Sequence, residues 1–143
     1  MFHSIFGCAV LLVVPAILCG CGQKSGVKLV KVTGIVRLDG EPLPGAQLTF
    51  VPLVEGGSAA YGQSDGSGKY RLKISRDTFG AMPGKNNVFV ELPGAKDAKD
   101  LKAHGFAVPP QGVKLSERYT KPGELTAEIP PDGGTVDIEL STK

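Results

Sequence analysis

From Leu29 onward, apolar and polar residues alternate with a period of two over most of the chain. This alternation is typical of β-strands that bury one face and expose the other. In the first run, Val30, Val32 and Val36 fall on one face. Lys31 and the other polar residues between them fall on the opposite face. The pattern therefore predicts a half-buried first strand.

Further alternating runs follow, and turn-forming Gly, Pro and Asp residues separate them. Their apolar positions are Ala46, Leu48 and Phe50; Tyr70, Leu72 and Ile74; Val88, Val90 and Leu92; Leu125, Ala127 and Ile129; and Val136, Ile138 and Leu140, with a weaker run from Ala59 to Ser64. Seven short strands with regular turn signals predict an all-β fold, a seven-stranded antiparallel sandwich.

The segment from Pro93 to Gly123 lacks this alternation. Ala95, Ala98 and Leu101 recur every three residues within a charged stretch, which predicts one short surface helix. We expect the remainder to be extended loop. Loops of this length in compact domains are commonly functional or mobile, so this segment is a candidate recognition element.

The N-terminal segment differs from the rest of the chain because residues 5–18 are apolar and uncharged. Fourteen residues are too few to span a bilayer as a helix, which needs about 20, and Pro15 weakens a helix further. The pattern predicts a cleaved signal peptide over residues 1–20. The alternative is a buried N-terminal strand or helix with ordinary packed cysteines.

The sequence Leu18-Cys19-Gly20-Cys21 resembles the lipobox of bacterial lipoproteins. The resemblance implies cleavage after Gly20 and a diacylglycerol thioether on Cys21, with palmitate among its fatty acids. Lipid on Cys19 is the alternative, but it would put the bulky Leu18 at the cleavage position. Two or more acyl chains anchor a protein stably, so lipid would hold this chain at its membrane.

Three regions follow from this interpretation: a signal peptide over 1–20, a lipidated tether over 21–28 and a β-sandwich domain over 29–143. The expected location is the cell envelope. Gly22 is not the Asp that favours inner-membrane retention in enterobacterial lipoproteins, so the resemblance implies the outer membrane rather than the inner membrane.

Charge and cysteine content restrict the functions that fit. The chain has 16 Lys and Arg against 14 Asp and Glu, a net charge of +2. Nucleic-acid binding usually needs a strongly basic patch, so we expect no nucleic-acid partner. Cys8 and Cys19 lie in the predicted signal peptide, which leaves Cys21 alone and predicts a domain without a disulfide.

Several motifs resemble the carboxypeptidase regulatory-like, or transthyretin-like, domain of bacterial lipoproteins. They are Val32–Val36 (VTGIV), Leu38–Ala46 (LDGEPLPGA), Phe50–Pro52 (FVP), Ser64–Tyr70 (SDGSGKY), Pro83–Lys85 (PGK) and Ser116–Tyr119 (SERY). The resemblance covers most of residues 30–141. It implies a prealbumin-like sandwich of seven strands, without peptidase activity, because that activity belongs to a separate zinc domain.

No catalytic or metal-binding constellation is evident. After Cys21 the only histidine is His104, whereas a zinc site needs three or four ligands and a serine triad needs an oriented histidine. Asp65-Gly66-Ser67-Gly68 is interpreted as a hairpin turn, because the further oxygen ligands of a calcium loop do not follow it. We therefore expect no enzyme activity, no metal and no cofactor.

Four cations, Lys69, Arg71, Lys73 and Arg76, form a ridge on and beyond one predicted strand. Clustered cations attract negative surfaces, so the ridge is a candidate contact for anionic glycan or lipid headgroups. The alternative is protective, because lysines on an edge strand discourage sheet-to-sheet aggregation.

The sequence therefore predicts a non-enzymatic, membrane-anchored lipoprotein that displays a structural or protein-interaction module. Its expected partners are the membrane, through the lipid on Cys21, and an envelope protein or glycan. The alternative is a carbohydrate-binding or small-ligand-binding module. For that alternative the aromatic supply is modest, since the chain has three Tyr and no Trp.

Overall fold

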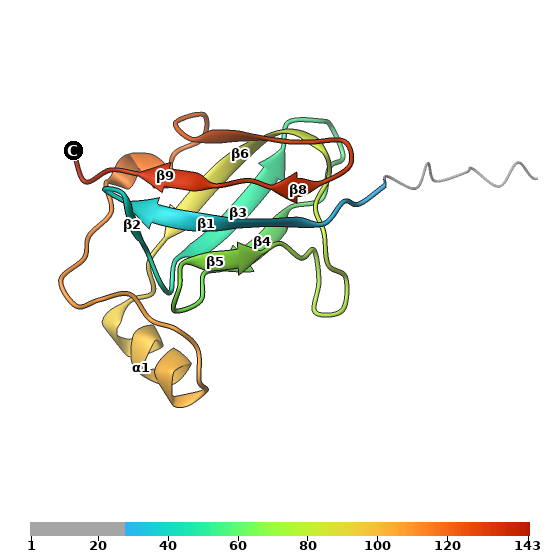
Figure 1. Ribbon diagram of the computed structural model, residues 1–143. Coiled ribbons are helices and arrows are strands. Elements are labelled where there is room, and N and C mark those ends of the chain that lie inside the picture. Colours follow the sequence, from blue (N-terminus) through green and yellow to red (C-terminus); the bar gives the residue numbers. More distant parts are fainter. Residues whose placement is uncertain (1–27) are drawn as a thin grey trace, which may run out of the picture.

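The computed structural model describes residues 28–143, which form a mostly β domain with one short helix (Figure 1). The expected signal peptide, Cys21 and nearly all of the expected tether lie outside the described residues. The elements are β1 (Val32–Leu38), β2 (Glu41–Pro42), β3 (Gln47–Pro52), β4 (Ala60–Gln63), β5 (Lys69–Arg71), β6 (Gly84–Glu91), α1 (Ala95–Ala103), η1 (Glu117–Thr120, a 3-10 helix), β7 (Thr126–Ile129), β8 (Gly134–Thr135) and β9 (Ile138–Leu140).

Two sheets pack face to face in an open sandwich (Figure 1). The first is built around β1, which pairs with β2 and β5 on one side and with β8 and β9 on the other. The second has the order β4-β3-β6-β7 and is antiparallel throughout. The expected all-β sandwich is confirmed at this level.

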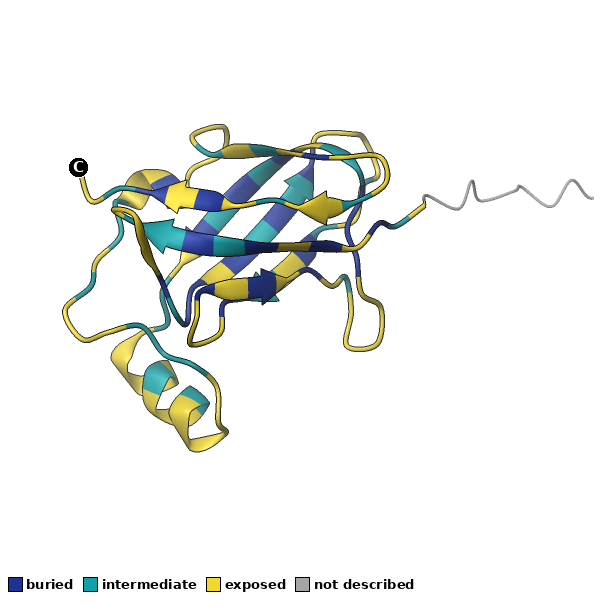
Figure 2. Ribbon diagram, in the orientation of Figure 1, coloured by how far each residue is buried: buried dark blue, intermediate teal, exposed yellow. Residues whose placement is uncertain are grey.

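The core lies between the sheets and follows the predicted alternation (Figure 2). Val32 and Val36 of β1 face Leu48 and Phe50 of β3 across the core, and all four are buried. Burial of a large apolar side chain contributes about 1.5–3 kcal/mol, so these alternating positions supply the main driving force for folding. The predicted inward faces of the alternating runs are confirmed.

The C-terminal strands depart from the expected antiparallel arrangement. Both β8 and β9 run parallel to β1, with Val32 opposite Gly134 and Val36 opposite Ile138. The cause is the crossing after β7: the turn Pro130 to Gly134 carries the chain from one sheet to the other, and it arrives beside the start of β1. The described residues form nine strands where seven were expected, and two of the nine have only two residues.

A close approach between β1 and the C-terminal strands explains the glycine at position 34. A Cβ on Gly34 would overlap the Val136 carbonyl oxygen, so no side chain fits at this position. The hydroxyl of Tyr70, which reaches across from β5, donates a hydrogen bond to that same oxygen. The Asp137 carboxylate accepts a hydrogen bond from the Ile35 amide at 3.0 Å. This contact lies in the gap between β8 and β9, where the backbone pairing with β1 is interrupted.

The two sheets meet along one edge, where the chain after β5 leaves the first sheet and joins the second. The backbone of Lys73 exchanges two hydrogen bonds with Tyr61 of β4, at 2.7 and 2.9 Å. Lys73 also pairs with Phe79 on its other side. We call the line where β4 meets residues 71–73 the seam. Lys73 is therefore paired on both sides, whereas β5, which carries Lys69 and Arg71, pairs only with β1 among the described strands and lies at the edge of its sheet, as the protective interpretation of the ridge expected.

The segment from Pro93 to Gly123 contains no strand, as predicted, and α1 occupies the predicted helical positions. No residue of α1 is buried, and the helix projects below the sandwich (Figure 2). The short helix η1 was not predicted. It holds Tyr119, which is buried and whose hydroxyl accepts a hydrogen bond from the Ser141 amide at 2.7 Å.

Candidate functional site

The four residues of the predicted cationic ridge separate into two groups. Arg71 at the end of β5 and Lys73 just beyond it line one surface pocket. Lys69 lies on the same exposed face of β5 but does not line the pocket, and neither does Arg76 in the following loop. Cys21 lies outside the described residues.

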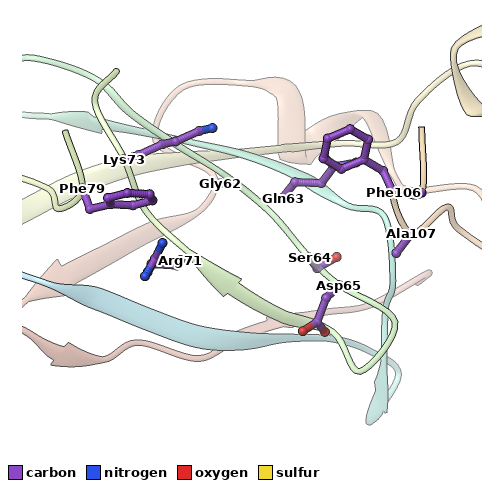
Figure 3. A pocket seen from close by; sticks show the side chains of 10 residues that line it. Gly62, Gln63, Ser64, Asp65, Arg71, Lys73, Phe79, Phe106 and Ala107 are labelled. Atoms are coloured by element: carbon purple, nitrogen blue, oxygen red, sulfur yellow. The ribbon is translucent and has the colours of Figure 1, made fainter. Parts of the chain in front are cut away.

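The seam pocket has a volume of about 330 Å³ and lies on the outer face of the seam (Figure 3). Its ten lining residues are Gly62, Gln63, Ser64, Asp65, Arg71, Lys73, Phe79, Gly105, Phe106 and Ala107. They come from β4 and the turn after it, from β5 and the chain that follows it, and from the loop after α1. This volume is at the lower end of the range of about 300–1,000 Å³ that is usual for small-ligand pockets.

Positive charge gathers at one end of the seam pocket. Figure 3 shows Arg71, Lys73 and Phe79 together at this end, with Phe106 and Asp65 at the other. The Arg71 guanidinium lies over the Phe79 ring, 3.7 Å from its centroid. This cation–π contact uses the flat face of the guanidinium and leaves its N–H edge available to an acceptor.

Neither cation of the pocket is neutralised within the described part of the chain. Among residues 28–143, salt bridges are formed only by Arg37, with Asp137 at 3.6 Å and with Glu139 at 3.0 Å. The Asp65 carboxylate is occupied in its own turn, where its Oδ1 accepts hydrogen bonds from the amides of Ser67 and Lys69. The predicted turn at Asp65 is present, and the Asp65 amide also donates a hydrogen bond to the Lys69 carbonyl at 2.8 Å. The strands on either side of the turn belong to different sheets, because β4 pairs with β3 and β5 pairs with β1.

One polar atom of the pocket lacks a partner. The Nε2 atom of Gln63 is buried, and no described residue accepts a hydrogen bond from it. A buried donor without an acceptor costs about 1–3 kcal/mol.

Exposed aromatic rings lie beside the cations and at the far end of the pocket (Figure 3). Tyr61, Lys73 and Phe79 are paired across adjacent strands, so their side chains stand side by side on the outer face. Tyr61, Phe79 and Phe106 are 50%, 47% and 54% exposed, and they are three of the five large apolar side chains exposed among the described residues. An apolar patch of this kind on a monomeric domain marks a candidate contact surface.

A larger apolar pocket of about 890 Å³ lies between α1 and residues 108–114. Its walls include Ala98, Val108 and Pro109, with Lys99 and Lys102 at its edge. Its polar lining residues are Lys99, Lys102, Gln111 and Lys114, and no aromatic residue lines it. The seam pocket combines two cations with two aromatic rings, so it is the better candidate for recognition.

Other polar groups of the domain have structural roles. Ser64, which borders the pocket, is buried and accepts a hydrogen bond from the Ala46 amide while it donates one to the Leu43 carbonyl. His104 caps the C-terminal end of α1, with its Nδ1 2.8 Å from the Asp100 carbonyl oxygen. Within residues 28–143 no group of three or more His, Cys, Asp and Glu is arranged to hold a metal ion.

The titration of Tyr70 is also explained by the fold. Burial raises the pKa of its hydroxyl well above the ordinary value, and the charge of Asp137 raises it further. The hydroxyl is therefore neutral at all physiological pH values. It acts as a fixed donor to the Val136 carbonyl rather than as an acid or base.

Four residues of the site, Tyr61, Gln63, Phe79 and Phe106, were not anticipated from the sequence. The alternation in β4 places Tyr61 and Gln63 outward, so a signal existed for these two. Phe79 and Phe106 lie in irregular segments without periodicity. The pocket also joins residues more than 40 positions apart, which no local pattern indicates.

None of the helices among residues 28–143 is long and apolar enough to cross a membrane. Comparison with known proteins finds no matching family model, no similar curated protein and no similar solved structure.

Proposed function

We propose that this chain is a non-enzymatic bacterial lipoprotein, held in the cell envelope by lipid on Cys21, that displays its sandwich domain as a structural or protein-interaction module. The outer membrane is its expected address. The observation that carries the proposal is the lipobox-like Leu18-Cys19-Gly20-Cys21 after an uncharged apolar run. A lipidated cysteine of this kind would be the first residue of the mature chain.

The start of the folded domain supports this arrangement. Val30 is fixed to Ala81 by two backbone hydrogen bonds of 3.0 Å, only nine residues beyond Cys21. A flexible tether of this length has a root-mean-square span of about 15–18 Å. The domain would therefore be presented close to the membrane surface.

The proposal includes a finer assignment of the fold, a prealbumin-like domain of the carboxypeptidase regulatory-like type. Support comes from the turn between β1 and β2, within the motif that carries the resemblance. Asp39 and Gly40 have φ values of 51° and 87°, as a tight hairpin of mirror-image turn type requires. Such a domain has no single associated function, so the assignment concerns architecture.

Lipid attachment is tested by expressing the full chain in a bacterial host with a fatty-acid analogue that can be labelled. We expect the wild type to incorporate label and to lose residues 1–20, and Cys21→Ala to do neither. Cys19→Ala is the matched control and should be labelled and processed normally. Label that persists in Cys21→Ala, or a wild type that keeps Met1, would contradict the proposal.

A second candidate function is binding of a carbohydrate or another small ligand. The seam pocket favours it, because two cations that form no salt bridge within residues 28–143 and two exposed aromatic rings line one cavity. Lipid anchoring and ligand binding are compatible, since the first concerns Cys21 and the second concerns the folded domain.

A further inference from the structure

We propose that the seam pocket binds an acidic carbohydrate, and that Arg71 and Lys73 hold the carboxylate of a uronic-acid unit while Phe79 and Phe106 contact sugar rings. The inference concerns the folded domain alone and does not depend on lipid attachment at Cys21.

The charge at one end of the pocket defines the anionic group. Arg71 and Lys73 line the same end, and no carboxylate among residues 28–143 forms a salt bridge with either. The Arg71 guanidinium lies over the Phe79 ring at this end of the pocket, and its N–H groups could donate to the two oxygens of a carboxylate. Asp65 lies at the opposite end, which orients the acidic group toward Arg71.

The remaining lining residues define the body of the ligand. Phe79 and Phe106 are about half exposed and lie toward opposite ends of the pocket, so an extended ligand would contact both rings. Sugar rings present apolar C–H faces that pack on aromatic rings through dispersion.

The hollow shape of the pocket favours a carbohydrate over a lipid headgroup layer. A bilayer surface is broad, whereas the pocket is a cavity of about 330 Å³ with donors on its walls. Lys69 and Arg76 would be expected to contribute to a flat, diffuse contact with an anionic surface, yet neither lines the pocket. A carbohydrate in the pocket should therefore depend on Arg71 and Lys73, whereas a flat anionic surface should depend on all four cations.

Calorimetric titration of the detergent-solubilised full chain with a short oligogalacturonate tests the proposal. We expect measurable binding to the free acid and at least about tenfold weaker binding to its neutral methyl ester, since the contact between the carboxylate and the two cations is lost. Arg71→Gln should weaken binding of the acid by at least about tenfold, and Phe106→Ala should weaken both forms.

Lys69→Gln is the matched control, because it removes the same charge from the same face of β5 outside the pocket. It should change affinity by less than about twofold. Lys73→Gln is a second pocket variant, in case Arg71→Gln disturbs the fold.

Three outcomes would overturn the proposal. They are an absence of binding to the free acid by the wild type, equal weakening by Lys69→Gln and Arg71→Gln, and binding to vesicles containing phosphatidylglycerol without binding to the oligosaccharide. The second outcome would indicate diffuse electrostatic attraction, and the third would indicate a membrane contact.

Discussion

In β3, Leu48 and Phe50 are fully buried and Thr49 between them points outward. In residues 93–123, by contrast, only Tyr119 is buried. The two regions are held by different forces. Burial at every second residue holds β3 between two neighbouring strands, β4 and β6. The long segment depends on one aromatic anchor and on partly buried contacts such as Val113 and Leu115. The sandwich therefore supplies most of the stability, and the sequence of residues 93–123 can vary at little cost to the free energy of unfolding.

The largest expected effect on stability comes from a substitution in the core of the sandwich. Phe50→Ala should lower the free energy of unfolding by about 3–5 kcal/mol, because it removes a fully buried ring and leaves a cavity. Thr49→Ala, one position away on the outer face, should cost less than about 1 kcal/mol. Denaturant unfolding measures both values. Equal losses would show that the assignment of inner and outer faces is wrong.

A smaller effect tests the anchor of the long segment. Tyr119→Phe keeps the buried ring but removes the hydroxyl that bonds to the Ser141 amide and carbonyl. We expect a loss of about 1–2 kcal/mol. Tyr61→Phe is the control, because the Tyr61 side chain is exposed at the seam and should change stability little. An equal effect of the two variants would contradict the anchoring role of Tyr119.

The helix α1 should contribute less to the stability of the domain than either Phe50 or Tyr119. Leu101→Ala replaces a partly exposed side chain of α1, a helix with no buried residue, and should cost less than about 1 kcal/mol. Alanine also favours helices slightly over leucine, which offsets part of the loss. A destabilisation as large as that of Phe50→Ala, measured by the same unfolding experiment, would mean that α1 packs against the core.

The smallest effect depends on pH and involves an exposed contact. The Thr142 hydroxyl and amide donate hydrogen bonds to the Asp39 carboxylate and hold its pKa below the ordinary value. A lowered folded-state pKa stabilises the fold above the unfolded pKa of about 4, and this contribution is lost as the pH falls through the folded pKa. Asp39→Asn should therefore melt slightly below the wild type at pH 7. The difference should narrow below pH 4, and a difference that grew there would reverse the assigned sign.

The same contrast explains how far the sequence predicts the structure. Alternation identifies the inner faces of β1, β3 and β6 because burial repeats over several residues. It gives no signal for β2 or β8, which have two residues each. The parallel pairing of β9 with β1 depends on which sheet the chain enters after Pro130, and this is a property of the assembled fold.

The candidate site was predictable only in part. Arg71 and Lys73 were identified only as members of a ridge of four cations with Lys69 and Arg76, because the period of a strand places Lys69, Arg71 and Lys73 on one face. The seam pocket requires Phe106, which reaches the seam through the loop after α1. Contacts between distant segments carry no local periodicity, so no pattern in the sequence separates Arg71 and Lys73 from Lys69 and Arg76.

The parallel pairing of β9 with β1 also sets the polarity of display. Because the two strands run in the same direction, Leu140 lies beside Leu38, at the opposite end of β1 from Val30 (Figure 1). β1 has seven residues, which extend over roughly 23 Å at about 3.3 Å per residue. In a chain anchored to a membrane ahead of Val30, a reporter fused after Lys143 would lie at the end of β1 that points away from the anchor.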